Sequence, residues 1–174
     1  MSTWAKGSLS DFPLIGMTAA SLRTALAFLC LLPASMAAQG KVSYATRSLD
    51  GAEVRVGAGQ PATIVAVFAT WCTTCRNEFS TLDSLQQALA SRKIRVLALS
   101  VDERDDAHVR RYADARRTRV LVARDASGAV GKTFGTVGVP ETYLVDMLGV
   151  VRWHGRGELR AGVAGLRRAI TAMK

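Results

Sequence analysis

The chain has 174 residues, of which 49% are hydrophobic and 21% are charged, with a formal net charge of +9. This composition is typical of one globular domain with at most a short appendage, and it excludes a disordered chain, which would have too few apolar residues to form a core. Three cysteines are too few for a small disulfide-stapled protein, so we expect cysteine chemistry that is catalytic or metal-binding. The arginines are interleaved with acids and lack the aromatic spacing of a base-stacking surface, which favours solvated faces and no nucleic-acid partner.

The N-terminal residues have the features of an export signal. Residues 25–32 (ALAFLCLL) form a short apolar run that follows a basic residue and precedes Ser35-Met36-Ala37. A basic flank, an apolar stretch of roughly 7–15 residues and a small-x-small ending characterise secretory signals. We therefore predict a signal peptide over residues 1–37, with an uncleaved membrane anchor as the alternative and either Met1 or Met17 as the start. The mature chain is then expected in the periplasm, free or held at the inner membrane.

The rest of the chain predicts alternating strands and helices. A short hairpin is expected first, around Asp50-Gly51, because this dipeptide favours a tight turn. Continuous apolar runs then predict fully buried strands, and apolar residues at helical spacing predict helices between them. In chain order, the predicted elements are strands 41–46, 53–56 and 63–68, a helix from Cys72 to 90, strand 94–101, helix 105–117, strand 120–123, a short helix ending at 134, strands 142–145 and 150–154, and a C-terminal helix with Leu159, Val163, Leu166 and Ile170 on one face.

This order of elements determines the expected fold class. Strands that alternate with helices, followed by a hairpin and a closing amphipathic helix, are typical of an α/β protein with helices covering a sheet. The sequence contains no internal repeat and no linker between two domains. We therefore expect a single α/β domain over residues 38–174.

Cysteine chemistry centres on Trp71-Cys72-Thr73-Thr74-Cys75. Cys30 lies in the apolar run of the signal and would be removed with it, which leaves one C-x-x-C pair. The pair follows a buried strand, and we expect Cys72 on the first turn of a helix, where backbone N–H groups and the helix dipole lower the pKa of its thiol. Cys72 would then attack a target disulfide, and Cys75 would resolve the mixed disulfide.

Half of a zinc site is the alternative explanation of the C-x-x-C pair. No second cysteine pair exists, and the two histidines, His108 and His154, lie far away in the sequence. We therefore favour redox chemistry and expect no metal. His108 falls on a polar helix and is expected to be solvated.

Three segments resemble one known family. Residues 69–78 (ATWCTTCRNE), 138–146 (GVPETYLVD) and 149–155 (GVVRWHG) are similar to the active-site helix start, the proline loop and the following hairpin of exported thioredoxin-like proteins of the TlpA, ResA and CcmG (DsbE) type. The similarity extends over about residues 42–174. It implies a thioredoxin-like fold, with a central mixed sheet flanked by helices and an N-terminal β-hairpin. It also implies a redox-active Cys72–Cys75 disulfide and no cofactor.

The resemblance also implies roles for residues around the cysteines. Pro140 would be a cis-proline facing the C-x-x-C pair, and the backbone edge at Val139 would pair with a substrate strand. Glu78 would tune the acidity of the thiols and relay protons, and an exposed helix glutamate is the alternative. The remaining predicted substrate contacts are Trp71, Thr73, Thr74 and Glu141.

The chain departs from the related patterns at two positions. Many relatives have proline as the second residue between the cysteines, where this chain has Thr74. Ordinary thioredoxins carry a buried acid six residues before the first cysteine, where this chain has Ala66. The first departure leaves the reduction potential open, and the second implies that the functional acid has moved to Glu78.

The leading functional hypothesis is a periplasmic thiol:disulfide oxidoreductase that reduces exported protein disulfides. By resemblance, the substrate is apocytochrome c, electrons come from a membrane thiol donor of the DsbD/CcdA type, and the protein is a monomer. The alternatives are a thiol oxidant or isomerase, and a non-enzymatic copper chaperone that would use His154 as a third ligand. The C-x-x-C spacing does not favour a peroxidase.

Overall fold

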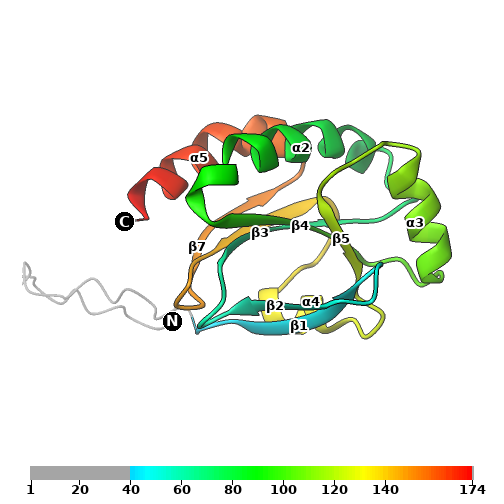
Figure 1. The fold of residues 1–174 in the computed structure, drawn as a ribbon, viewed down its shortest axis with the longest axis horizontal. Helices are drawn as coiled ribbons and strands as arrows, with labels where there is room; N and C mark the ends of the chain where they lie inside the picture. Colours follow the sequence, from blue (N-terminus) through cyan, green and yellow to red (C-terminus); the bar gives the residue numbers. More distant parts are fainter. Residues whose placement is uncertain (1–39, 174) are drawn as a thin grey trace, which may run out of the picture. The chain divides into compact units, whose positions relative to one another are not determined.

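The computed structural model describes residues 40–173, and the expected signal over residues 1–37 lies outside them. A seven-stranded sheet forms the centre of this part of the chain, with strand order β2-β1-β5-β4-β3-β6-β7 (Figure 1). The β3–β4 and β4–β5 pairs are parallel, and the other neighbours are antiparallel, so the sheet is mixed. The strands are β1 (Ser43–Ser48), β2 (Glu53–Gly57), β3 (Ala62–Phe68), β4 (Ile94–Ser100), β5 (Leu121–Arg124), β6 (Glu141–Val145) and β7 (Val151–Arg156).

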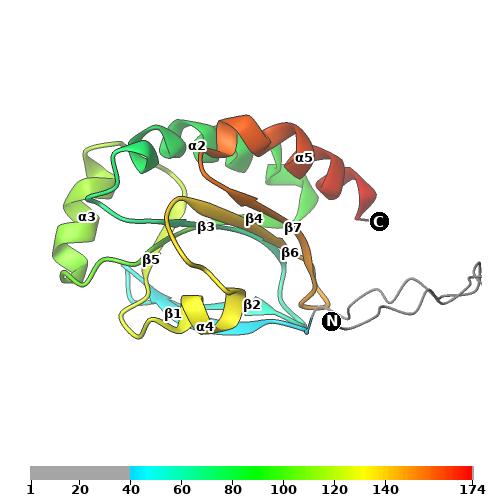
Figure 2. The ribbon, with the colours of Figure 1, turned by 180° about the vertical axis from the view of Figure 1, so that it is seen from behind.

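Helices lie on both sides of the sheet. Helices α2 (Glu78–Ala88) and α5 (Leu159–Ala172) lie side by side on one face, as Figures 1 and 2 show from opposite sides. Helix α3 (Asp106–Asp114) adds Val109 and Ala113 to the core on that face, whereas α4 (Ala129–Phe134) adds Val130 to the core on the other face. Both faces of the central strand β3 are therefore covered, and all seven of its residues are buried.

The strands agree with the predicted strands to within a few residues. Strands β1 and β2 pair antiparallel from Ser43 opposite Gly57 to Arg47 opposite Glu53. Helix α3 begins after Asp105, whose carboxylate accepts the N–H of His108 at 2.8 Å, as expected for an acidic N-cap.

The helix predicted from Cys72 begins later than expected. A 3-10 helix, η1 (Thr74–Asn77), comes first and leads directly into α2, so Cys72 precedes the helical residues. The first N–H groups of a helix have no acceptor within the helix, and the sulfur of Cys72 accepts one of them from outside.

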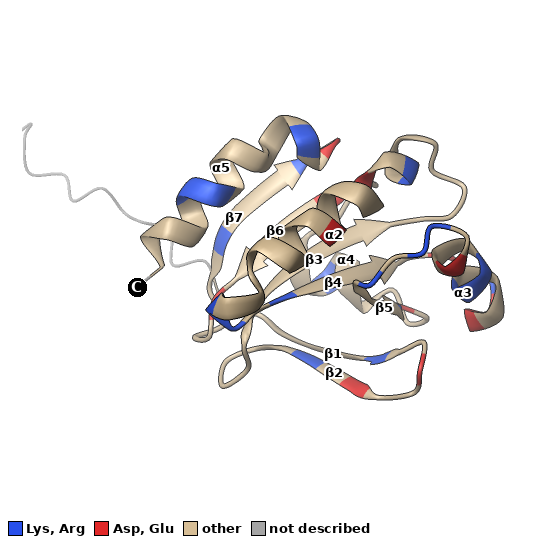
Figure 3. Cartoon of the chain, turned by 45° about the horizontal axis from the view of Figure 1, so that its top comes forward, with Lys and Arg blue, Asp and Glu red and all other residues tan. Residues whose placement is uncertain are grey.

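Charged residues of both signs are interspersed on the surface. Helix α3 carries Asp106, Arg110, Arg111 and Asp114 within nine residues, visible as adjacent red and blue segments in Figure 3. Arg110 also pairs with Asp50 at 2.9 Å. Within residues 40–173, no helix combines the length and the apolar character needed to cross a membrane.

Candidate active site

The C-x-x-C pair lies just beyond the end of the central strand β3. Cys72 and Cys75 form a disulfide, and the N–H of Cys72 donates to the carbonyl of Ala69 at 3.2 Å. Cys75 is fully buried and Cys72 is 6% exposed, whereas the neighbouring Trp71 is 70% exposed. Cys72 is therefore the sulfur nearer to the surface, as an attacking cysteine must be, and Cys75 is shielded behind it.

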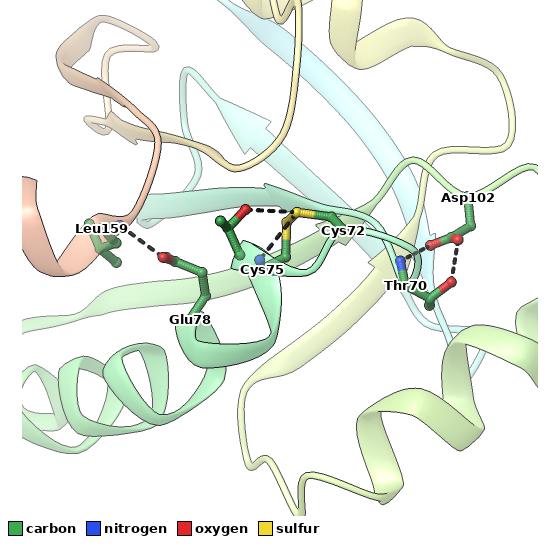
Figure 4. Close-up of a disulfide and its surroundings, with 7 residues drawn as sticks. Thr70, Cys72, Cys75, Glu78, Asp102 and Leu159 are labelled. Carbon is green, nitrogen blue, oxygen red and sulfur yellow. Dashed lines mark hydrogen bonds between the residues drawn. A yellow bond between two sulfur atoms is a disulfide. The ribbon is translucent and has the colours of Figure 1, made fainter.

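Two hydrogen-bond donors point at the sulfur of Cys72. The N–H of Cys75 lies 3.2 Å from Sγ, and the hydroxyl of Thr74 lies 3.3 Å from it (Figure 4). The disulfide sulfur carries no proton, so the threonine hydroxyl is the donor. Donors placed in this way stabilise a thiolate once the disulfide is reduced. The sequence suggested Thr74 only as a substrate contact, and a proline at this position would have no hydroxyl to donate.

Glu78 is buried beneath the cysteines at the start of α2. It is 5% exposed, so the alternative of an exposed helix glutamate is wrong. Its Oε1 accepts the N–H of Leu159 at 2.9 Å, and its buried Oε2 has no hydrogen-bond partner among residues 40–173. Burial raises the pKa of this carboxyl group, and the charge of Glu158 raises it further, against the lowering effect of the Leu159 N–H.

The peptide bond between Val139 and Pro140 is cis, as the resemblance implies. Pro140 is buried, and its carbonyl accepts the N–H of Gly157 at 2.9 Å. Val139 is half-buried and packs against the core cluster that contains both cysteines. The proline loop and the C-x-x-C pair therefore contact the same hydrophobic cluster.

Glu141 has its carboxylate turned into the protein. The residue is 2% exposed, and its oxygens accept hydrogen bonds from the Tyr143 hydroxyl and, at 3.4 Å, from the N–H of Val137. His154 Nε2 and Arg156 Nε lie 3.1 and 3.4 Å away. Burial raises the pKa of Glu141, but the hydrogen bonds from Tyr143, Val137 and His154 and the charge of His154 outweigh it and leave the pKa below its usual value. The carboxylate therefore holds the loop that precedes β6, and it would influence a substrate only through that loop.

His154 belongs to the Glu141 cluster. Its ring stacks on Tyr143, with ring centroids 4.4 Å apart. Among residues 40–173, no three His, Cys, Asp or Glu side chains form a group that could hold a metal ion, and the His154 ring lies against Glu141 and Tyr143.

Sequence reasoning missed Asp102, Thr70 and His108. Asp102 is 2% exposed and accepts two hydrogen bonds from Thr70, drawn in Figure 4. His108, expected to be solvated, instead places Nε2 3.0 Å from the Thr70 hydroxyl. Thr70 and Asp102 each follow an apolar run that the sequence predicts as a strand. The carboxyl ends of neighbouring parallel strands meet at one edge of a sheet, so these positions were the signal that could have placed the two residues together.

Comparisons with known proteins agree with this geometry. The thiol:disulfide interchange protein DsbE of Tatumella citrea is 32% identical over 100 residues, which cover 58% of this chain and 52% of that protein. Its namesake from Yersinia pestis is 35% identical over 96 residues, which cover 55% and 49%. The chain thus spans about half the length of these curated relatives.

A solved structure shares the fold. The Chlorobium tepidum protein described as a candidate thiol:disulfide interchange protein DsbE has a TM-score of 0.66 and 22% identity, over 76% of this chain and 93% of that one. The thioredoxin-like fold implied by the three sequence segments is therefore confirmed. Residues 39–154 match the AhpC/TSA family model, and the chain belongs to the AhpC/TSA family.

Proposed function

We propose that this protein is a thiol:disulfide oxidoreductase that reduces disulfides in exported proteins. The observation that carries the proposal is the asymmetric Cys72–Cys75 disulfide: Cys72 is slightly exposed, next to the exposed Trp71, and Cys75 is fully buried. Two donors on the Cys72 sulfur favour its thiolate as the attacking group. The names of the curated relatives support the same chemistry.

The proposed reaction moves two electrons from the protein to its target. In the reduced protein, the Cys72 thiolate attacks one sulfur of the target disulfide and expels the other as a thiolate. The Cys75 thiolate then attacks the Cys72 sulfur in the mixed disulfide, and the second target sulfur leaves. The target gains two electrons, and Cys72 and Cys75 return to the disulfide. A membrane dithiol would reduce this disulfide again.

Glu78 is suited to take the proton of Cys75 in the second step. Its carboxyl group is buried, has one oxygen without a partner among residues 40–173, and is three residues after Cys75. Its raised pKa makes the ionised carboxylate a stronger base, and proton transfer from Cys75 avoids two buried negative charges. Glu78 would therefore accept the proton as Cys75 becomes the nucleophile.

The exposed residues around Cys72 would form the substrate surface. Trp71 and Thr73 are exposed beside the sulfur, and the backbone edge at Val139 is the proposed site for pairing with an extended substrate segment. Glu141 would support this edge from inside the protein.

The cellular setting completes the proposal. Residues 1–37 would export the chain, and residues 38–174 would work in the periplasm as a thioredoxin-like domain, free or held by an uncleaved anchor. Apocytochrome c is the proposed substrate, and a membrane thiol protein of the DsbD/CcdA type is the proposed electron donor. We expect the protein to act as a monomer.

Trapping tests the exchange chemistry. A Cys75→Ser chain should hold its partner as a mixed disulfide through Cys72, because the resolving thiolate is absent. The adduct should disappear on addition of dithiothreitol and should be absent from a Cys72→Ser, Cys75→Ser control. If purified apocytochrome c in its disulfide form and other oxidised envelope proteins give no adduct, disulfide exchange is excluded.

The reduction potential decides the direction. Reductants of this fold lie near −270 mV and strong oxidants near −120 mV, so equilibration in dithiothreitol or glutathione buffers separates the two roles. We expect a value close to or below about −270 mV. A value near the oxidising end would make the protein a thiol oxidant or isomerase instead.

A further inference from the structure

Side-chain hydrogen bonds join the two central strands beyond the end of their ladder. The parallel pairing of β3 and β4 ends at Phe68 and Ser100, and one more backbone bond runs from Val101 N–H to the Phe68 carbonyl. Asp102 lies two residues after Ser100, and Thr70 lies two residues after Phe68. Asp102 accepts the N–H of Thr70 at 2.9 Å through Oδ2 and the hydroxyl of Thr70 at 2.5 Å through Oδ1. The carboxylate thus ties the start of the β3–η1 junction to the end of β4.

The same carboxylate is held from its own strand. The Ser100 hydroxyl donates to Asp102 Oδ2 at 2.6 Å, and the Asp102 N–H donates to the Ser100 oxygen at 3.1 Å. Asp102 is 2% exposed and Ser100 is fully buried. Three donors, the N–H and hydroxyl of Thr70 and the hydroxyl of Ser100, therefore fix the position of this buried carboxylate.

A histidine on α3 completes the network. The Thr70 hydroxyl gives its proton to Asp102, so the short contact to His108 Nε2 at 3.0 Å requires that nitrogen to be the donor. His108 Nδ1 then faces Arg104 Nη1 at 3.4 Å as an acceptor. Three elements, β3, β4 and α3, therefore converge on Thr70.

We propose that Asp102 is a positioning residue for the disulfide exchange, which acts by holding Thr70 and thereby the backbone that presents Cys72. Thr70 is two residues before Cys72, and the N–H of Cys72 is bonded back to Ala69 within the same turn. The Cys75 N–H and the Thr74 hydroxyl can stabilise the sulfur only while this turn holds Cys72 at 3.2–3.3 Å from them. Small displacements of a reacting group reduce rates strongly.

The test removes one of the two Thr70–Asp102 hydrogen bonds and keeps the charge of Asp102. In a chain with Cys30 and Cys75 replaced by serine, Cys72 is the only thiol, and its alkylation by iodoacetamide is followed from pH 4 to pH 10. Thr70→Val deletes the hydroxyl that Asp102 accepts. We expect alkylation to become about three- to tenfold slower in the acidic part of the profile, where most of the thiol is protonated, the effect of weakening one hydrogen bond to the thiolate, with an unchanged rate at pH 10.

Matched variants separate positioning from general loss of stability. Thr70→Ser keeps the hydroxyl and should restore the pH profile. Thr46→Val removes a comparable threonine bond, 2.9 Å to the Arg124 carbonyl between β1 and β5, and should leave the profile unchanged. Thr70→Ala adds no bulk and should repeat the effect of Thr70→Val in a chain shown by its melting curve to be folded.

The proposal is overturned if Thr70→Val and Thr70→Ala have the same profile as the parent, or if Thr46→Val shifts the profile as much as they do. The positioning role rests on the proposed function, but alkylation requires no protein substrate. If trapping fails but the Thr70 variants shift the pH profile of alkylation, only the exchange function is rejected. If trapping succeeds but the profile does not shift, only the role of Asp102 is rejected.

Discussion

The carboxylate of Glu78 accepts the backbone N–H of Leu159 at 2.9 Å, although 81 residues separate the two in the chain. Leu159 is the first residue of α5, so its N–H has no acceptor within its own helix. Glu78 supplies that acceptor from the start of α2. The residue proposed to move a proton at the active site is therefore also a contact between two helices on the same face of the sheet.

The burial of Glu78 predicts an unusual dependence of stability on pH. A raised folded pKa means that the folded protein binds this proton more tightly than the unfolded chain, so the contribution of Glu78 to stability is greatest at low pH and is lost as the pH rises through the folded pKa. Glu78→Gln keeps an oxygen for Leu159 and cannot ionise. We expect the oxidised variant to equal the parent near pH 4 and to exceed its free energy of unfolding at pH 7.5.

Urea unfolding of the oxidised proteins at the two pH values measures this difference. Glu103→Gln is the control, because Glu103 is an exposed glutamate outside the active site and should show no such divergence. A Glu78→Gln variant that is less stable than the parent at pH 7.5 would contradict the raised pKa.

Thr74 is predicted to stabilise the thiolate of Cys72 through its hydroxyl. Thr74→Val keeps the shape and removes the donor, which at a cost of about 1 kcal/mol lowers the acid dissociation constant of the Cys72 thiol roughly fivefold and so raises its pKa. Absorbance of the thiolate at 240 nm, titrated against pH in the chain with Cys72 as its only thiol, would measure the change. Thr73→Val alters an exposed neighbour with no hydrogen bond to the sulfur, and an equal effect from it would refute the role of the Thr74 hydroxyl.

Trp153 occupies the space above a glycine of α5. A Cβ at Gly165 would lie 2.9 Å from Trp153 Nε1, closer than such contacts allow, and the rigid indole ring cannot bend away. We expect Gly165→Ala to lower the free energy of unfolding by about 1 kcal/mol, because overpacking outweighs the gain in helix propensity.

Gly131 provides the helical comparison for Gly165. A Cβ there would make an ordinary 3.6 Å contact with the carbonyl of Thr136, so Gly131→Ala should be neutral or stabilising by about 0.5 kcal/mol. Denaturant titration of both variants checks the pair. Equal changes in the two would show that Trp153 does not limit the size of residue 165.

Much of the fold was predictable because its signals are local. The apolar runs that became β3 and β4 are continuous, and the spacing of Leu159, Leu166 and Ile170 marks the buried side of α5. The start of the active-site helix was less predictable. Its first turn is a 3-10 helix beginning at Thr74, a choice that depends on how the chain leaves β3.

The surroundings of the site residues could not be predicted in the same way. Glu141 was expected to face the substrate, yet its carboxylate is buried against Tyr143, His154 and Arg156. His108 was expected to be solvated, yet it contacts Thr70. The contacts of Glu141 lie within β6 and across the β6–β7 hairpin, and the contact of His108 joins α3 to the end of β3; composition and periodicity record none of them.

The sequence by itself determined that this chain carries one C-x-x-C pair at the end of a buried strand. Both the spacing of the two cysteines and the apolar run before them are properties of one short segment. Only the tertiary structure decided which groups surround that pair. It buried Glu78 against Leu159 and brought Asp102 to Thr70. The physical reason is that burial and hydrogen bonding, which set the acidity and position of a group, depend on neighbours that folding brings together from distant parts of the chain.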